Sequence, residues 1–140
     1  MQRKLQMTRE KHLELIQGVI NRMAGNSFQL KGWSVVLVSA LFALAAKDMR
    51  VHFVFVAYFP AVAFWVLDGY FLQQEKMYRR LYDEVRQAKG DPDFSLDASE
   101  YGKKVDSWAT VCLSKTLLIF HGMVLGVVVA ATVLVFTLAS

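Results

Sequence analysis

The sequence contains a single cysteine, Cys112. One thiol cannot form an internal disulfide, which excludes the class of small secreted domains that disulfide bonds hold together. The N-terminal stretch is basic, but no apolar run and no Ala-x-Ala site follow it closely. We therefore expect no cleaved signal peptide.

Catalytic groups in a recognisable arrangement are also missing. His12, His52, His121 and Cys112 are scattered along the chain without the spacing of metal ligands. No glycine-rich phosphate loop is present, and no base stands beside Ser114. The sequence therefore predicts a protein that is not an enzyme and uses no cofactor.

Charge is absent from long parts of the chain. Hydrophobic residues make up 55% of the sequence, and the mean hydropathy is +0.33. At a length of 140 residues this balance favours a single membrane-embedded domain. The net charge is +4, but the charged residues stand in blocks, and their placement is more informative than their total.

Three apolar stretches are each about as long as one membrane crossing, which needs on the order of 20 residues. They cover residues 28–46, 51–72 and 117–138. Lys31 and Trp33, near the start of the first stretch, are typical of an interfacial anchor. Pro60 lies inside the second, where a proline usually kinks the helix. The sequence therefore predicts an all-α membrane protein with three transmembrane helices.

An amphipathic helix is expected before the first crossing, over residues 8–23. Its apolar side chains recur at helical spacing on one face. They are Leu13, Ile16, Ile20 and Met23. Thr8 is the expected N-cap, and residues 25–27 are expected to interrupt the helix, with Asn26 or Ser27 capping the next one. Such a helix either lies on the membrane surface or packs against another helix in water.

The second crossing runs into the polar segment 73–89 without a helix breaker, apart from the weak one at Gly69. We predict one long helix that leaves the membrane and extends into the cytoplasm. The predicted domains are an N-terminal amphipathic cytoplasmic helix, residues 1–26, and a three-helix transmembrane bundle, residues 27–138. The bundle carries a cytoplasmic helix–loop insert at 73–110.

The basic residues predict the topology. Of the 16 lysines and arginines, eight lie from Lys76 to Lys115 and none follows Lys115. Six more precede or open the first crossing, and only two stand in the short turn at 47–50. The positive-inside rule then places the N-terminus and the insert in the cytoplasm and the C-terminus in the periplasm.

Asp68 stands about one helical turn inside the cytoplasmic end of the second crossing. An unpaired carboxylate costs roughly 2.5–3.5 kcal/mol at a membrane helix centre and less near the helix end. Lys31 and Lys115 lie at similar depths on the other two crossings, so either could pair with Asp68. Asp68 is a candidate for a gate or for a ring of carboxylates in a pore. The alternative is an interfacial aspartate that reaches head groups and water.

His121 lies deeper, in the third crossing. It is a candidate pore-lining or proton-sensitive residue, and we group it with Asp68, Lys115 and Lys31 as predicted pore or gating residues. The alternative, which we favour, is a neutral histidine that is bonded to a neighbouring helix.

A ridge of small residues runs along the third crossing. Gly122, Gly126 and Ala130 recur every fourth residue. This spacing lets helix backbones approach closely, so we predict a helix-packing or oligomer contact there.

The polar segment after the second crossing combines basic and aromatic side chains. The predicted ligand-binding residues are Lys76, Tyr78, Arg79, Arg80, Tyr82 and Arg86. Basic and aromatic groups together are typical of a nucleotide or oligonucleotide site. The alternative is a solvated helix face with intrahelical ion pairs. Those pairs would be Glu75–Arg79, Arg79–Asp83 and Arg80–Glu84.

Most of the chain resembles a family of small bacterial membrane proteins. The likeness lies in residues 12–33, in the run 68–82 with its Tyr-Arg-Arg-Leu-Tyr end, and in residues 93–97. Paired crossings followed by a charged Tyr-Arg-x-Leu helix are similar to the SLATT effectors, which neighbour nucleotidyltransferase genes in bacterial defence operons. The pattern is also similar to the transmembrane effector of Hailong-type anti-phage systems. The resemblance implies an oligomeric channel controlled by a nucleic-acid-like signal from a partner nucleotidyltransferase.

Together these observations predict a homo-oligomeric protein of the bacterial inner membrane, with a tetramer as the expected assembly. It would form an ion channel or pore in contact with membrane lipid. A nucleotide or short oligonucleotide would gate it at its cytoplasmic helices, and it would depolarise the cell in anti-phage defence. Two rival functions stay open: a structural or accessory subunit of a larger membrane complex, and a holin-like lysis protein.

Overall fold

The computed structural model describes residues 2–48 and 51–139, and these residues form helices and loops without a β-strand. The elements are α1 (Gln2–Asp48), α2 (His52–Val56), α3 (Tyr58–Gln87), the 3₁₀ helix η1 (Ser99–Lys103), α4 (Trp108–Cys112) and α5 (Lys115–Ala139). Within them, residues 3–47, 52–87 and 115–137 each hold a helical window long and apolar enough to cross a membrane. The prediction of an all-α chain with three such helices is confirmed.

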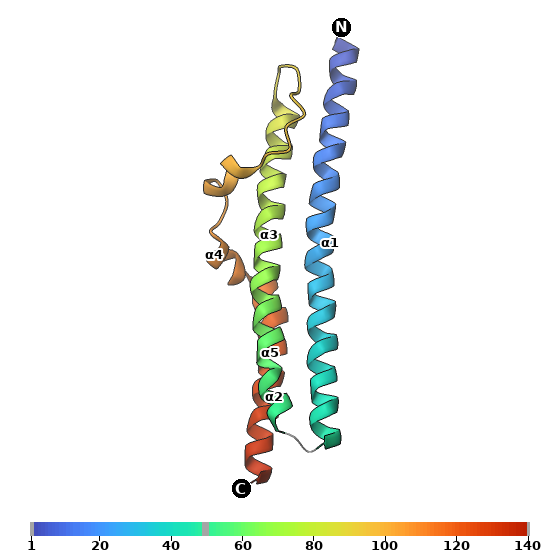
Figure 1. Cartoon of the computed structure of the whole chain (residues 1–140). Helices are drawn as coiled ribbons and strands as arrows, with labels where there is room; N and C mark the ends of the chain where they lie inside the picture. The colour runs from blue at the N-terminus through green and yellow to red at the C-terminus, as the bar shows by residue number, and fades with distance from the viewer. Residues whose placement is uncertain (1, 49–50, 140) are drawn as a thin grey trace.

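α1 and α3 lie side by side and run in opposite directions (Figure 1). α5 accompanies only the half of α3 that is nearer to α2, so the other half of the α1–α3 pair extends beyond it. We call this extension, residues 2–26 and 73–107, the stalk. The part in which α1, α3 and α5 pack together, residues 27–48, 52–72 and 115–139, is the three-helix bundle.

α1 is a single helix, and the predicted interruption at residues 25–27 is wrong. Ser27 is buried inside the helix, and it caps nothing because its hydroxyl donates to Asp68 of α3. Thr8 is likewise internal and donates to the carbonyl of Lys4 at 2.8 Å. A continuous buried face toward α3, from His12 through Ile16 to Val38, keeps α1 helical. Tertiary packing here overrides the weak local preference of Gly25 against helix.

The second predicted crossing is divided between α2 and α3 at Ala57. Pro60 stands three residues later, and its ring lacks the N–H that would bond to the carbonyl of Val56. Ala57 keeps helical angles, φ −64° and ψ −21°, but it is a turn residue between the two helices. The helix is therefore interrupted three residues before Pro60, inside the stretch where the sequence predicted a proline kink. From Tyr58 the helix runs to Gln87, as expected for one rod that joins bundle and stalk.

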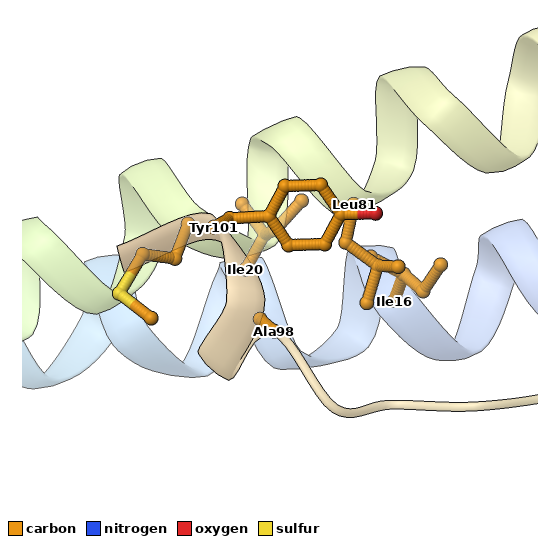
Figure 2. Packing of buried hydrophobic residues seen from close by; sticks show 6 residues of the cluster. Ile16, Ile20, Leu81, Ala98 and Tyr101 are labelled. Atoms are coloured by element: carbon orange, nitrogen blue, oxygen red, sulfur yellow. The ribbon is translucent and has the colours of Figure 1, made fainter. Parts of the chain in front are cut away.

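The stalk has its own apolar core. Ile16 and Ile20 of α1 meet Met77 and Leu81 of α3, and Tyr101 closes the core from η1 (Figure 2). The apolar face of the N-terminal helix is thus covered by another helix, which is the second of the two arrangements that we expected. In the bundle, a second core joins α1, α2, α3 and α5. Its buried members are Val38, Ala57, Ala61 and Val128.

The stalk core yields a stability prediction. Ile16 is fully buried, whereas its neighbour Leu15 is 44% exposed. Ile16→Ala should lower the free energy of local unfolding of the stalk by about 3 kcal/mol, because it removes buried methyl groups and leaves a cavity. Leu15→Ala is the matched control. Amide hydrogen exchange over residues 8–26 measures both, and equal protection in the two variants would contradict the packing described.

Candidate functional site

A cluster of charged and polar side chains is buried where the stalk joins the three-helix bundle. Asp68 of α3 has no exposed surface. Its Oδ1 accepts from the hydroxyl of Ser27. Its Oδ2 lies 2.5 Å from Nζ of Lys31 and 2.7 Å from Nε2 of His121. One carboxylate from α3 therefore binds donors from both α1 and α5, and we call these four residues the Asp68 cluster.

The hydrogen bonds of the cluster determine where the protons lie. Nε2 of His121 faces a carboxylate oxygen that can only accept, so Nε2 carries a hydrogen. The other ring nitrogen, Nδ1, is buried and has no hydrogen-bond partner among the described residues. Lys31 also donates to the hydroxyl of Ser27 at 2.8 Å, which leaves that hydroxyl free to donate to Asp68.

Aromatic and small residues close the cluster on the α4 side. The indole of Trp65 stacks on the His121 ring, with centroids 6.0 Å apart and planes 5° from parallel. Trp65 Nε1 donates to the carbonyl of Cys112 at 2.9 Å. Gly69 faces the thiol of Cys112 so closely that an added Cβ would collide with its sulfur. α4 therefore packs directly on α3 beside the cluster.

The sequence predicted part of this arrangement. Of the two partners considered for Asp68, the structure places Lys31 against it, whereas Lys115 is exposed at the first turn of α5. An Asp68 that reaches water and head groups does not agree with its complete burial. His121 is bonded to a neighbouring helix, as in the alternative that we favoured.

Ser27 and Trp65 were not among the predicted site residues. Ser27 could have been found from its spacing, since Ser27, Lys31 and Ser34 recur every three or four residues on one face of an otherwise apolar helix. Ser34 is fully buried one turn further along α1, and its hydroxyl has no hydrogen-bond partner among the described residues. Trp65 gave no such signal, because aromatic side chains are ordinary in an apolar helix.

A second polar feature is a groove in the stalk, between α3 and the segment that follows η1. Its volume is about 510 Å³. Its lining residues are Lys76, Arg79, Arg80, Asp83, Lys103, Lys104, Val105 and Asp106. With five cations and two carboxylates, this basic groove can bind an anion.

Ion pairs occupy some of the cations of the basic groove. Lys76 pairs with Asp106 at 2.7 Å, and Arg79 with Glu75 at 2.7 Å, the latter pair as predicted. Arg80 and Lys103 have no ion-pair partner among residues 2–48 and 51–139. The predicted pairs of Arg79 with Asp83 and of Arg80 with Glu84 are not formed there. Instead Asp83 meets Arg86 at 3.4 Å, and Glu84 meets Lys104 at 3.9 Å.

The structure changes the membership of the predicted ligand site. Tyr78 and Tyr82 pack against the apolar core of the stalk and do not line the basic groove, and Arg86 is also outside its lining. Lys103 and Lys104 join the groove although they are distant in sequence. The hydrogen bond from Lys76 lowers the pKa of Asp106, so this exposed carboxylate stays charged at neutral pH.

The small-residue ridge of α5 is not used for packing within the chain. Apart from its chain neighbours and the backbone of α5 itself, no atom of the described chain lies within 4 Å of the position that a Cβ would take at Gly122 or at Gly126. Ala130, the third member, is exposed. The ridge is therefore open to a contact outside this chain.

Protein-family models, curated proteins and solved structures were each compared with the chain, and none of the three comparisons found a match. Function therefore has to be inferred from the residues and their geometry.

The Asp68 cluster yields a double-mutant prediction. Asp68→Asn should lower the stability of the protein by about 3 kcal/mol, because it leaves the partly buried ammonium of Lys31 without a counter-charge. Adding Lys31→Met should recover part of that loss, which thermal unfolding in detergent micelles measures.

The control for this cycle is Glu14→Gln. Glu14 pairs with Lys11 at 2.8 Å, and both side chains are 67% exposed, so that variant should cost less than about 1 kcal/mol. If Asp68→Asn cost no more than Glu14→Gln, the cluster would not be a buried ion pair.

Proposed function

We propose that the protein is a multi-pass protein of the bacterial inner membrane that assembles as a homo-oligomer and forms an ion channel or pore. The observation that carries this proposal is the Asp68 cluster, in which three helices of membrane-spanning length share one buried carboxylate. Ionisable groups are costly in apolar helices and typically mark ion pathways, relays or gates.

The distribution of basic residues supports one orientation in the membrane. The stalk carries most lysines and arginines, and the opposite end of the bundle has few. With the positive-inside rule, the stalk and the N-terminus lie in the cytoplasm and the C-terminus lies in the periplasm. The Asp68 cluster then lies near the cytoplasmic boundary of the membrane.

An ion pathway between copies of the chain fits the packing better than a pathway within one copy. α1, α3 and α5 pack around buried apolar residues such as Ala61 and Val128. The ridge of Gly122, Gly126 and Ala130 is open, which suits close contact with a second copy. We propose a ring of subunits, with a tetramer as the expected number, in which this ridge forms the subunit contact.

The basic groove is the proposed site of control by a nucleotide or short oligonucleotide, made by a partner nucleotidyltransferase. Phosphates would pair with cations that lack a strong partner, foremost Arg80 and Lys103. α3 runs without interruption from the groove to Asp68. A ligand that joins α3 to the segment after η1 can therefore bias the helix that carries the charge cluster. Opening such a channel would depolarise the cell, as an effector of anti-phage defence does.

The channel proposal predicts a phenotype for Asp68→Asn. The substitution removes the negative charge but keeps the shape of the side chain, so insertion and assembly should persist while ion conduction changes. Membrane potential in cells, read with a voltage-sensitive dye, should differ several-fold in its rate of collapse from that of cells with the unaltered protein. Unchanged depolarisation at equal membrane abundance would remove Asp68 from the conduction or gating machinery.

Ligand binding in the basic groove predicts the effect of the double substitution Arg79→Ala and Arg80→Ala. Removing two of the five groove cations should weaken binding of a fluorescent single-stranded oligonucleotide by roughly tenfold or more, and should reduce the salt dependence of binding. Fluorescence anisotropy with the purified full chain in detergent measures both quantities.

Arg22→Ala is the matched control for this binding test, because Arg22 is an exposed stalk arginine on α1 outside the groove. Equal binding by the Arg79/Arg80 variant and the Arg22 variant would reject the groove as the ligand site. A protein that depolarises no membrane but copurifies with another membrane complex would instead favour the accessory-subunit function.

A further inference from the structure

Two donors converge on one oxygen of Asp68. Nζ of Lys31 lies 2.5 Å from Oδ2, and Nε2 of His121 lies 2.7 Å from the same atom. With Lys31 charged and His121 neutral, the positive and negative charges of the cluster balance. A proton added to His121 would place two cations on a single carboxylate oxygen, which repel each other strongly in a buried site.

His121 has a place for that proton. Its Nε2 is already bonded to Asp68, whereas Nδ1 is a buried nitrogen without a hydrogen-bond partner among the described residues. The imidazole also lies parallel to the indole of Trp65.

The surroundings contain few other groups that titrate. α1 presents Lys31 to the cluster, α3 presents Asp68, and α4 places the thiol of Cys112 beside Gly69. On α5 itself, the edge of the Phe120 ring meets His121 and adds no charge. The competition for Asp68 therefore lies between Lys31 and His121.

Exposure decides which cation leaves when both are charged. The side chain of His121 is completely buried, whereas that of Lys31 is 21% exposed. A lysine ammonium on a flexible chain can move to water and keep its apolar stem in place, which the ring of His121 cannot do.

We propose that His121 is a proton-binding site, and that its protonation displaces Lys31 from Asp68. The proton adds to Nδ1, and the resulting imidazolium becomes the counter-ion of the carboxylate. The ammonium of Lys31 turns toward water and ends the charged link between α1 and α3. Among the described residues, the hydrogen bond from Ser27 and apolar contacts then hold the 47-residue α1 rod at this level. The physiological consequence, an ion channel that responds to acid, rests on the proposed function.

The first test measures proton binding itself on the purified full chain in detergent micelles. With ¹⁵N-labelled histidine, the ring nitrogens of His121 should change from the signals of a neutral imidazole to those of a protonated one as the pH is lowered. His52 is exposed and serves as the internal reference. His121→Gln assigns the signal, since glutamine keeps an N–H for Asp68 but cannot take up a proton. If the His121 signals stay constant while those of His52 move, the proposal is overturned.

The second test follows the displacement of Lys31. Acetylation of Lys31 by a water-soluble reagent is compared by mass spectrometry with that of Lys47, an exposed lysine on the same helix, so that the pH dependence of the reagent cancels. The Lys31 to Lys47 ratio should rise severalfold as the pH falls through the titration of His121, and should stay constant in His121→Gln. A constant ratio in the unaltered protein, or an equal rise in the variant, rejects the displacement.

Ion flux from liposomes that contain the protein completes the test. In the unaltered protein, flux should depend on pH over the same interval, and His121→Gln should remove that dependence while His52→Gln retains it. Flux that responds equally to pH in His121→Gln rejects His121 as the sensor. Absence of any flux would count against the channel proposal, and the titration and acetylation results would still decide the proton site.

Discussion

The neutralisation of one buried carboxylate is the constraint on which the rest of the structure depends. Asp68 lies where water does not reach, and a bare charge at such a place costs several kcal/mol. Its compensation needs Ser27 and Lys31 from α1 and His121 from α5 at hydrogen-bonding distance at the same time. Because apolar packing tolerates sliding and charge pairing does not, this cluster sets the register of the three long helices.

The Asp68 cluster also lies at the junction between the three-helix bundle and the stalk. On one side, the three-helix bundle packs through Val38, Ala61 and Val128; on the other, the stalk packs through Ile16 and Leu81. Two continuous helices, α1 and α3, pass through the junction. A change of charge at Asp68 therefore acts on both helices that reach the stalk, and a change in the stalk acts on the cluster.

Features that depend on neighbouring residues agree with the predictions from the sequence, whereas several features that depend on distant residues do not. The three predicted apolar helices depend on local composition, and the structure agrees with them. The predicted interruption of α1 is wrong because the local preference of residues 25–27 against helix is weak. Packing of α1 against α3 keeps these residues helical. The basic groove was found only in part, since Lys103 and Lys104 reach Arg80 through the fold and not through the sequence.

Local composition is enough to predict the helical class, the three apolar stretches, the polar extension of the second one, and the short list of ionisable residues within them. Hydropathy and helical periodicity are summed over neighbouring residues, so they can be read without knowing which helices touch. Helix packing determines that Asp68 meets Lys31 rather than Lys115 and that His121 joins the same oxygen. It also determines that Tyr78 packs inward while Lys103 faces the groove. These contacts depend on the relative rotation and register of helices that are far apart in the chain. The need to balance the buried charge of Asp68 fixes that rotation and register, and the local sequence does not encode them.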